Sequence, residues 1–270
     1  MKPRVAFFDF ASCEGCQLAL LNCEDILLDI LGLVDIVEFR EAISETSPRY
    51  DVAFIEGSVN REMDMERLRE IRARSTYVVA IGACACNGNV QARSNLIAPA
   101  ENYKSVYGEE ARNRVQTDER YWPLWSHTRV RAIKRVIKVD FELRGCPMVP
   151  AEFLHLTKAL ITGSLPSFPA NAVCVECKKN ENECVLAQGR TCMGPVIYGG
   201  CNAVCVNGGY VCDGCRGLLP HANVDAHRQL MRDHRIPDDQ ILSRYRLFCA
   251  NEAIGKSEIM GPSSQSESDR

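Results

Sequence analysis

Apolar runs that alternate with amphipathic segments organise the first half of the chain. Five segments are predicted strands: residues 4–10, 35–41, 50–59, 76–84 and the end of 133–147. The runs over 4–10, 50–59 and 76–84 have the apolar character of buried strands. Three segments carry apolar positions at helical spacing: residues 16–31, 62–75 and 150–163. Strands that alternate with helices predict an α/β fold with a doubly wound parallel sheet, close to the flavodoxin arrangement.

The pattern changes after Pro166. Residues 171–215 hold eight cysteines among Gly, Asn and Pro, and they lack strong apolar periodicity. Such a segment cannot fold around hydrophobic burial alone, so we expect bound metal to supply much of its stability. The chain therefore divides into three predicted regions: a flavodoxin-like domain (1–165), a small, loop-rich cysteine domain (166–250) and a polar tail (251–270).

Composition and charge exclude several classes of protein. Hydrophobic residues make up 46% of the chain, which is enough for a core without covalent cross-links. The 32 basic and 35 acidic residues leave a net charge of −3, so nothing indicates a nucleic-acid binder. No apolar run has the length of a membrane span, and the first residues read as a buried strand rather than an export signal. We therefore expect a cytoplasmic protein.

Fifteen cysteines are the most informative feature of the composition. An odd number without an export signal argues against a disulfide framework and favours metal ligands. Four of them follow predicted strands: Cys13, Cys16, Cys84 and Cys146. Because the carboxyl ends of parallel strands meet at one edge of a sheet, we expect these thiols to converge. A thioredoxin-like redox pair at Cys13 and Cys16 is the alternative, but it leaves Cys84 and Cys146 unexplained.

Eight further cysteines form two groups of four. The first has the spacing C-x2-C-x6-C-x7-C, at Cys174, Cys177, Cys184 and Cys192. The second has the spacing C-x3-C-x6-C-x2-C, at Cys201, Cys205, Cys212 and Cys215. Four thiolates in each group suit a cubane [4Fe-4S] cluster, and turns rich in Gly and Asn let backbone N–H groups reach the sulfurs. Paired zinc sites are the alternative, with C-x2-C knuckles at both ends and the other four cysteines left for a second zinc.

Three cysteines remain outside these groups. Cys23 lies on the apolar face of the first predicted helix, and Cys249 lies in the segment "YRLFCAN", so we expect both to be structural. Cys86 follows Cys84 by two residues and is an alternative ligand in its place, but two thiols on one tight loop do not readily both reach one corner of a cluster. We therefore expect Cys86 to lie beside the ligands.

The chain shows no site for substrate chemistry of its own, and we assign it no catalytic residue. It contains no phosphate-binding or strand-coupled dinucleotide glycine motif and no nucleophile-elbow serine. Glu14 and Glu56 lie at the same end of the predicted sheet as the first four cysteines. They are candidates for a proton relay, and the alternative is a pair of exposed loop glutamates.

An ordered series of motifs spans most of the chain: "SCEGC", "IEGSV", "GACACNGNVQ", "GCP", "VCVEC", "GPVIYGGCNAVC" and "CDGCRG". This series resembles the small subunit of cytoplasmic [NiFe] hydrogenases, in particular the sulfhydrogenase delta-subunit type. The resemblance runs from about residue 4 to residue 235. It implies an electron-transfer subunit of an oxidoreductase that acts on H2.

The resemblance also implies the ligands of three [4Fe-4S] clusters. A proximal cluster would take Cys13, Cys16, Cys84 and Cys146, next to the nickel–iron centre of a large subunit. A distal cluster would take Cys174, Cys177, Cys184 and Cys192, and a medial cluster would take Cys201, Cys205, Cys212 and Cys215. Electrons would then pass between the large subunit and a flavin- or ferredoxin-type acceptor subunit.

Two positions depart from many periplasmic relatives. Cys174 stands where those relatives have a histidine, and Cys205 restores a fourth medial ligand. Both changes favour lower potentials, which suit a soluble acceptor. The related quinone-reductase subunit lacks the eight-cysteine segment. A homologous small subunit of another oxidoreductase complex and a zinc-stabilised scaffold without redox function remain the alternatives.

Overall fold

A five-stranded parallel sheet forms the first half of the protein. The computed structural model describes residues 2–23, 28, 29, 32–98, 101, 102, 104–109 and 128–252. Its strands are β1 (Arg4–Asp9), β2 (Asp35–Phe39), β3 (Tyr50–Glu56), β4 (Ser75–Ile81) and β5 (Phe141–Leu143). The strand order is β2-β1-β3-β4-β5, and every pair is parallel. This is the flavodoxin-like order, so the predicted α/β fold class is confirmed.

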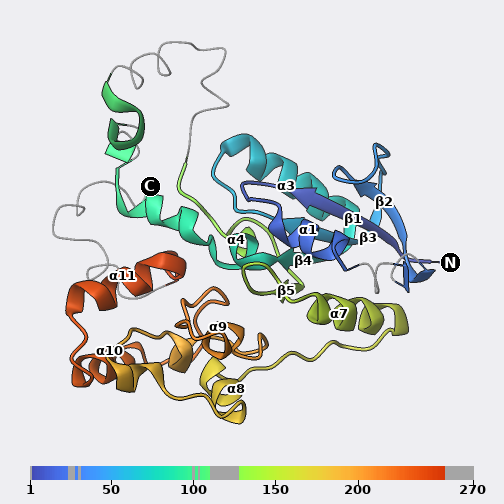
Figure 1. The fold of residues 1–270 in the computed structure, drawn as a ribbon. Helices are drawn as coiled ribbons and strands as arrows, with labels where there is room; N and C mark the ends of the chain where they lie inside the picture. Colours follow the sequence, from blue (N-terminus) through green and yellow to red (C-terminus); the bar gives the residue numbers. More distant parts are fainter. Residues whose placement is uncertain are drawn as a thin grey trace.

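Helices follow the strands and continue into the cysteine-rich half (Figure 1). The α-helices are α1 (Gly15–Leu21), α3 (Glu62–Arg74), α4 (Gly82–Asn87), α7 (Pro150–Thr162), α8 (Val173–Lys179), α9 (Val204–Asn207), α10 (Val224–Asp233) and α11 (Asp238–Phe248). The 3-10 helices are η1 (Val90–Leu96), η2 (Ile133–Arg135), η3 (Val185–Gln188) and η4 (Gly194–Val196). In the part of the chain that the structure describes, no helix is long and apolar enough to cross a membrane.

Each face of the sheet has its own apolar core. On one face, Phe7 and Phe54 pack against Phe153 of α7, with ring centroids 6.1 and 4.7 Å from it. On the other face, Leu68 and Ile71 of α3 pack against the alternate residues of the same strands. Successive side chains of a strand point to opposite faces, so the continuous apolar runs in the sequence supply both cores.

A third core lies outside the sheet, among the helices that Figure 1 colours yellow to red. Met231 of α10 and Tyr245 of α11 are buried there against Val173 and Met193. Helix α11 also contacts η1 of the first half, and Leu96 packs against this core. The cysteine-rich segment therefore packs against apolar residues that lie outside it in the sequence.

Several predicted elements differ in extent from the structure. The expected helix over 16–31 begins at Gly15 and its described part ends at Leu21, while residues 24–27, 30 and 31 lie outside the described part. The expected strand over 76–84 ends at Ile81, and α4 begins at Gly82, whose φ of +80° breaks the extended backbone.

Candidate functional site

The first four predicted ligands lie at the edge of the sheet where the strand order reverses. Strands β1 and β3 are neighbours, although β2 lies between them in the sequence, so their carboxyl ends form the switch point of the fold. Cys13 and Cys16 follow β1, and a bridge between Ala11 and Ser58 joins the loops after β1 and β3. Open α/β sheets bind ligands at this position.

Cys16 is the most deeply enclosed of these four thiols. It is the second residue of α1, and its backbone N–H donates to Glu56 Oε1 at 3.1 Å. The N–H of Gln17 donates to Glu56 Oε2 at 2.9 Å. Glu56 ends β3, so its carboxylate fixes the start of α1 against the sheet edge. The backbone N–H of Met148 donates to the Cys16 thiol at 3.4 Å.

Cys84 and Cys146 reach the same site from β4 and β5. Cys84 lies in α4, not at the end of a strand as the sequence pattern predicted. The N–H of Ala83 donates to Gly145 O at 2.6 Å and holds the Cys84 and Cys146 loops together. A side chain on Gly82 would overlap the Cys16 sulfur. Only glycine leaves room there for the Cys16 thiol.

Asn89 is a contributor that the sequence did not reveal. Its Nδ2 donates to Cys84 Sγ at 3.0 Å and lies 3.7 Å from Cys146 Sγ. The residue is buried and has a φ of +53°. The sequence shows that Asn89 belongs to the motif "GACACNGNVQ", but it does not show that the side-chain amide points at the thiols. Donors to cluster sulfurs help to set the reduction potential.

The electrostatics of these thiols fit a positively charged group between them. Burial raises the pKa of Cys84 to about 11; the Asn89 hydrogen bond opposes this, and Cys146 and Cys13 add to it. Burial and then Glu56 raise the pKa of Cys16 as well. Metal coordination deprotonates a thiol and offsets such crowding. A donor set of four mutually close thiols therefore fits an iron–sulfur cluster.

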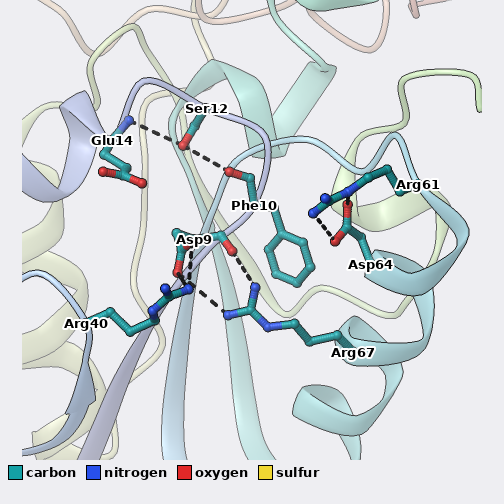
Figure 2. A network of polar contacts seen from close by, with 8 residues as sticks. All are labelled: Asp9, Phe10, Ser12, Glu14, Arg40, Arg61, Asp64 and Arg67. Carbon is teal, nitrogen blue, oxygen red and sulfur yellow. Dashed lines mark hydrogen bonds and ion pairs between the residues drawn. The ribbon is translucent and has the colours of Figure 1, made fainter. Parts of the chain in front are cut away.

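Glu14 borders this site in a network of charged residues (Figure 2). Arg40 and Arg67 both point at the Asp9 carboxylate, with N–O distances of 3.4 and 3.6 Å. The Glu14 N–H donates to Ser12 Oγ at 3.3 Å. Burial, followed by Glu41 and Asp9, raises the pKa of Glu14. Glu56 is buried and accepts two backbone hydrogen bonds, so it is not an exposed loop glutamate. The proton relay stays a prediction.

The second group of thiols surrounds the start of α8. Burial raises the pKa of Cys174 to about 12, and the thiols of Cys192, Cys177 and Cys184 raise it further in that order. A Cβ atom on Gly194 would lie 3.3 Å from Cys174 Sγ and 3.4 Å from Cys192 Sγ. The four cysteines with the C-x2-C-x6-C-x7-C spacing are therefore close neighbours in space.

The third group lies between the other two. Burial raises the pKa of Cys215 to about 12; the N–H of Cys146 opposes this, and Cys201, Cys146 and Cys205 add to it. Cys215 therefore contacts the first group through Cys146. Cys212 is buried, and after burial the Cys192 thiol of the second group raises its pKa most. The three groups thus form a series, with the Cys201 group in the middle.

Within the described ranges, no three His, Cys, Asp or Glu side chains are arranged to hold one metal ion. The four thiolates of a cubane bind four different iron atoms, so they need not meet at one point.

The remaining cysteines have other surroundings. Cys86 is buried in the core on the α3 face, with its sulfur 3.6 Å from Ala80 O and 3.7 Å from Leu143 O. Residues two apart on a helix point in different directions, so Cys86 points away from the site that Cys84 faces. Cys249 is fully buried in the third core. Cys23 is half-buried and contacts Ala19 O at 3.0 Å.

Comparison with known proteins identifies the family to which this chain is related. The family model of the NADH ubiquinone oxidoreductase 20 Kd subunit matches residues 13–160. Sulfhydrogenase 2 subunit delta of Pyrococcus furiosus is 36% identical over 247 residues, which cover 91% of this chain and 98% of that protein. This chain belongs to the hydrogenase small-subunit family. The predicted resemblance is confirmed.

Other members of the hydrogenase small-subunit family lead to the same result. A subunit of the F420-non-reducing hydrogenase vhu of Methanococcus voltae is 31% identical, over 80% of this chain and 82% of that protein. A chain of an NAD+-reducing [NiFe]-hydrogenase structure has 26% identity and a TM-score of 0.52, over 63% of this chain and 96% of that chain. The 20 Kd match ends before Cys174, whereas the Pyrococcus relative also matches most of the cysteine-rich half.

One structural neighbour covers almost the whole chain. The actinobacterial-type NiFe-hydrogenase of Ralstonia eutropha H16 has a TM-score of 0.54, over 95% of this chain and 88% of its own. At 15% identity this likeness concerns the fold alone.

Proposed function

We propose that this chain is the electron-transfer small subunit of a cytoplasmic [NiFe] hydrogenase. It would hold three [4Fe-4S] clusters between the nickel–iron centre of a large subunit and a flavin- or ferredoxin-type acceptor subunit. The observation that carries the proposal is the series of three four-cysteine groups, joined through the Cys146–Cys215 and Cys192–Cys212 contacts. The names of the relatives supply the reaction with H2.

Each group has a separate task in this proposal. Cys13, Cys16, Cys84 and Cys146 would hold the proximal cluster at the sheet edge, where Asn89 and the Met148 N–H donate to the sulfurs. The Cys201 group would hold the medial cluster and the Cys174 group the distal one. Iron–sulfur clusters, when bound, accept and release single electrons.

The proposed domain division follows the cores. Residues 1–165 would form the flavodoxin-like domain around the two cores of the sheet. Residues 166–250 would form the two-cluster domain around the third core. Nickel ligands would belong to the large subunit, so this chain alone should not react with H2.

Elemental analysis of the complex purified through this chain tests the proposal. Under anaerobic conditions we expect about twelve iron and twelve sulfide per chain, at four of each per cubane, together with one nickel in the large subunit. Iron and sulfide without nickel would favour a small subunit of another oxidoreductase complex. Zinc at about two or three per chain without sulfide would contradict the proposal and favour the zinc-stabilised scaffold.

A further inference from the structure

Arg216 is a buried arginine at the junction of the two halves of the chain. It follows Cys215 directly, and only 4% of its surface is exposed. Its Nη2 forms an ion pair with Glu152 Oε1 of α7 at 2.7 Å. Its Nε donates to Gly199 O and its Nη1 donates to Arg144 O, both at 2.7 Å. All three nitrogens of the guanidinium group are therefore engaged.

These contacts join loops that carry ligands of different cysteine groups. Gly199 precedes Cys201 by two residues, and Arg144 precedes Cys146 by two residues. Arg144 returns a hydrogen bond from its Nη1 to Arg216 O at 3.2 Å. One guanidinium group thus fixes the backbone beside Cys146 relative to the backbone beside Cys201.

The Arg216–Glu152 ion pair fits only because the backbone beside it has a glycine, Gly200. Gly200 has a φ of +111°, and a Cβ atom there would collide with Glu152 Oε1 and lie 2.5 Å from Arg216 Nη2. A side chain at this position is therefore incompatible with the pair as it stands. The glycine next to Cys201 leaves room for the charges.

Stability is a weak explanation for such a pair. Removing two charges from water costs free energy that their attraction often does not exceed, and apolar residues of similar size are often as stabilising. Arginine cannot lose its proton in a protein, so Arg216 is a permanent positive charge on the residue that follows Cys215, held against backbone two residues from Cys146 and from Cys201. A positive charge favours the more negative, reduced form of a nearby cluster, and a carboxylate such as Glu152 opposes this.

We propose that Arg216, balanced by Glu152, is a positioning residue that fixes the Cys146 and Cys201 loops relative to each other and raises the reduction potentials of the clusters they hold. This inference rests on the proposed function. It adds a charge pair, outside the ligand set, that aligns the first two groups of the series.

The sign of a potential shift tests the charge. The variants are Arg216→Met, Arg216→Lys and Glu152→Gln in the complete purified complex, each analysed first for iron and sulfide. Electron paramagnetic resonance during a redox titration then gives the midpoint potentials. We expect Arg216→Met to lower the potentials of the proximal and medial clusters and Glu152→Gln to raise them.

Arg216→Lys separates position from charge. It keeps the positive charge but lacks the planar fork that reaches Gly199 O and Arg144 O. We expect potentials near the unmodified values, with a changed magnetic coupling between the proximal and medial clusters. Arg72→Met is the matched control, because it removes the arginine from another partly buried ion pair, with Asp140, away from the thiols. It should leave both readouts unchanged.

Several outcomes would overturn the inference. Unmoved potentials with full cluster content, or shifts of the same sign in Arg216→Met and Glu152→Gln, would contradict this inference but not the proposed function. If Arg216→Met does not accumulate, the near-isosteric Glu152→Gln decides, because its potentials must rise. Absence of iron and sulfide from the unmodified complex would instead contradict the proposed function, and the inference with it.

Discussion

Hydrogen bonds to the sheet-edge thiols come from residues outside the predicted ligand set. The Asn89 amide reaches Cys84 and Cys146, and the Met148 N–H reaches Cys16. A bond from an N–H group to a sulfur stabilises the reduced form of a cluster, so these donors, together with burial, would set the potential of a cluster bound there. At the scale of single residues, the ligand set alone does not define the site.

Asn89→Gly tests the effect of the amide. Glycine accepts the positive φ of this position, so the change removes the donor with little backbone strain. We expect a lower midpoint potential for the proximal cluster and unchanged iron content. The measurement is a redox titration followed by electron paramagnetic resonance. Asn95→Gly is the control, because the Asn95 amide donates to Val130 O and Asn251 Oδ1. Equal potentials in Asn89→Gly and the unmodified protein would contradict this role.

Gly82→Ala tests the space beside Cys16. The added methyl group would overlap the Cys16 sulfur, in addition to the strain of a φ of +80°. We expect the proximal cluster to be lost, which leaves about eight iron atoms per chain of about twelve. Gly163→Ala is a matched control, because Gly163 has a φ of +68° but open space around it. Full iron content in Gly82→Ala would show that the thiol can move aside.

At the scale of elements, α10 and α11 hold the loop that carries Cys192 of the second cysteine group. His227 of α10 has Nε2 at 2.9 Å from Cys192 O and Nδ1 at 2.5 Å from the Tyr245 hydroxyl of α11. A carbonyl oxygen only accepts, so Nε2 carries the proton and Nδ1 accepts from Tyr245. Burial lowers the pKa of His227, which favours this neutral form. Two helices beyond the cysteine segment therefore orient the Cys192 loop.

Tyr245→Phe removes the hydrogen bond between Tyr245 and His227. The change leaves His227 Nδ1 buried without a partner, so we expect a loss of about 1–3 kcal/mol in stability. Calorimetry of the assembled complex should show a lower midpoint of thermal unfolding. Tyr210→Phe is the control, because the Tyr210 side chain is 72% exposed. Equal midpoints for Tyr245→Phe and the unmodified complex would contradict the supporting role of these helices.

At the scale of the whole molecule, the three cysteine groups form one series. The first stands at the carboxyl ends of the strands, the Cys201 group contacts it through Cys215 and Cys146, and the Cys174 group follows through Cys212 and Cys192. If the clusters are bound there, a break at the first group should isolate the large subunit from the acceptor. The order of the groups in the sequence differs from their order in space.

Cys13→Ala tests that path. Loss of this ligand should empty the proximal site and stop H2-dependent reduction of the acceptor, while hydrogen isotope exchange at the large subunit continues. The Cys23→Ala variant is the control, because Cys23 is half-buried and its sulfur contacts the Ala19 carbonyl of α1. If electrons still reach the acceptor when the proximal cluster is absent, a single linear path is wrong.

The sequence predicted the features that depend on local spacing. Strand and helix periodicity indicated the α/β class, because the side-chain period of each element is a local property. The position of Cys13, Cys16, Cys84 and Cys146 after predicted strands indicated that they converge, since parallel strands share one carboxyl edge. The C-x2-C and C-x3-C spacings separated the other eight thiols into two groups.

Only the tertiary structure decided contacts between distant segments. Periodicity could not show that the chain turns at Gly82 into α4, which points Cys84 toward the site and Cys86 into the opposite core. Nor could it show that Glu56 binds the start of α1, or that Arg216 pairs with Glu152 across 64 residues. Each of these depends on which segments meet in space. The sequence therefore determined which thiols could act together, and the fold determined what surrounds them.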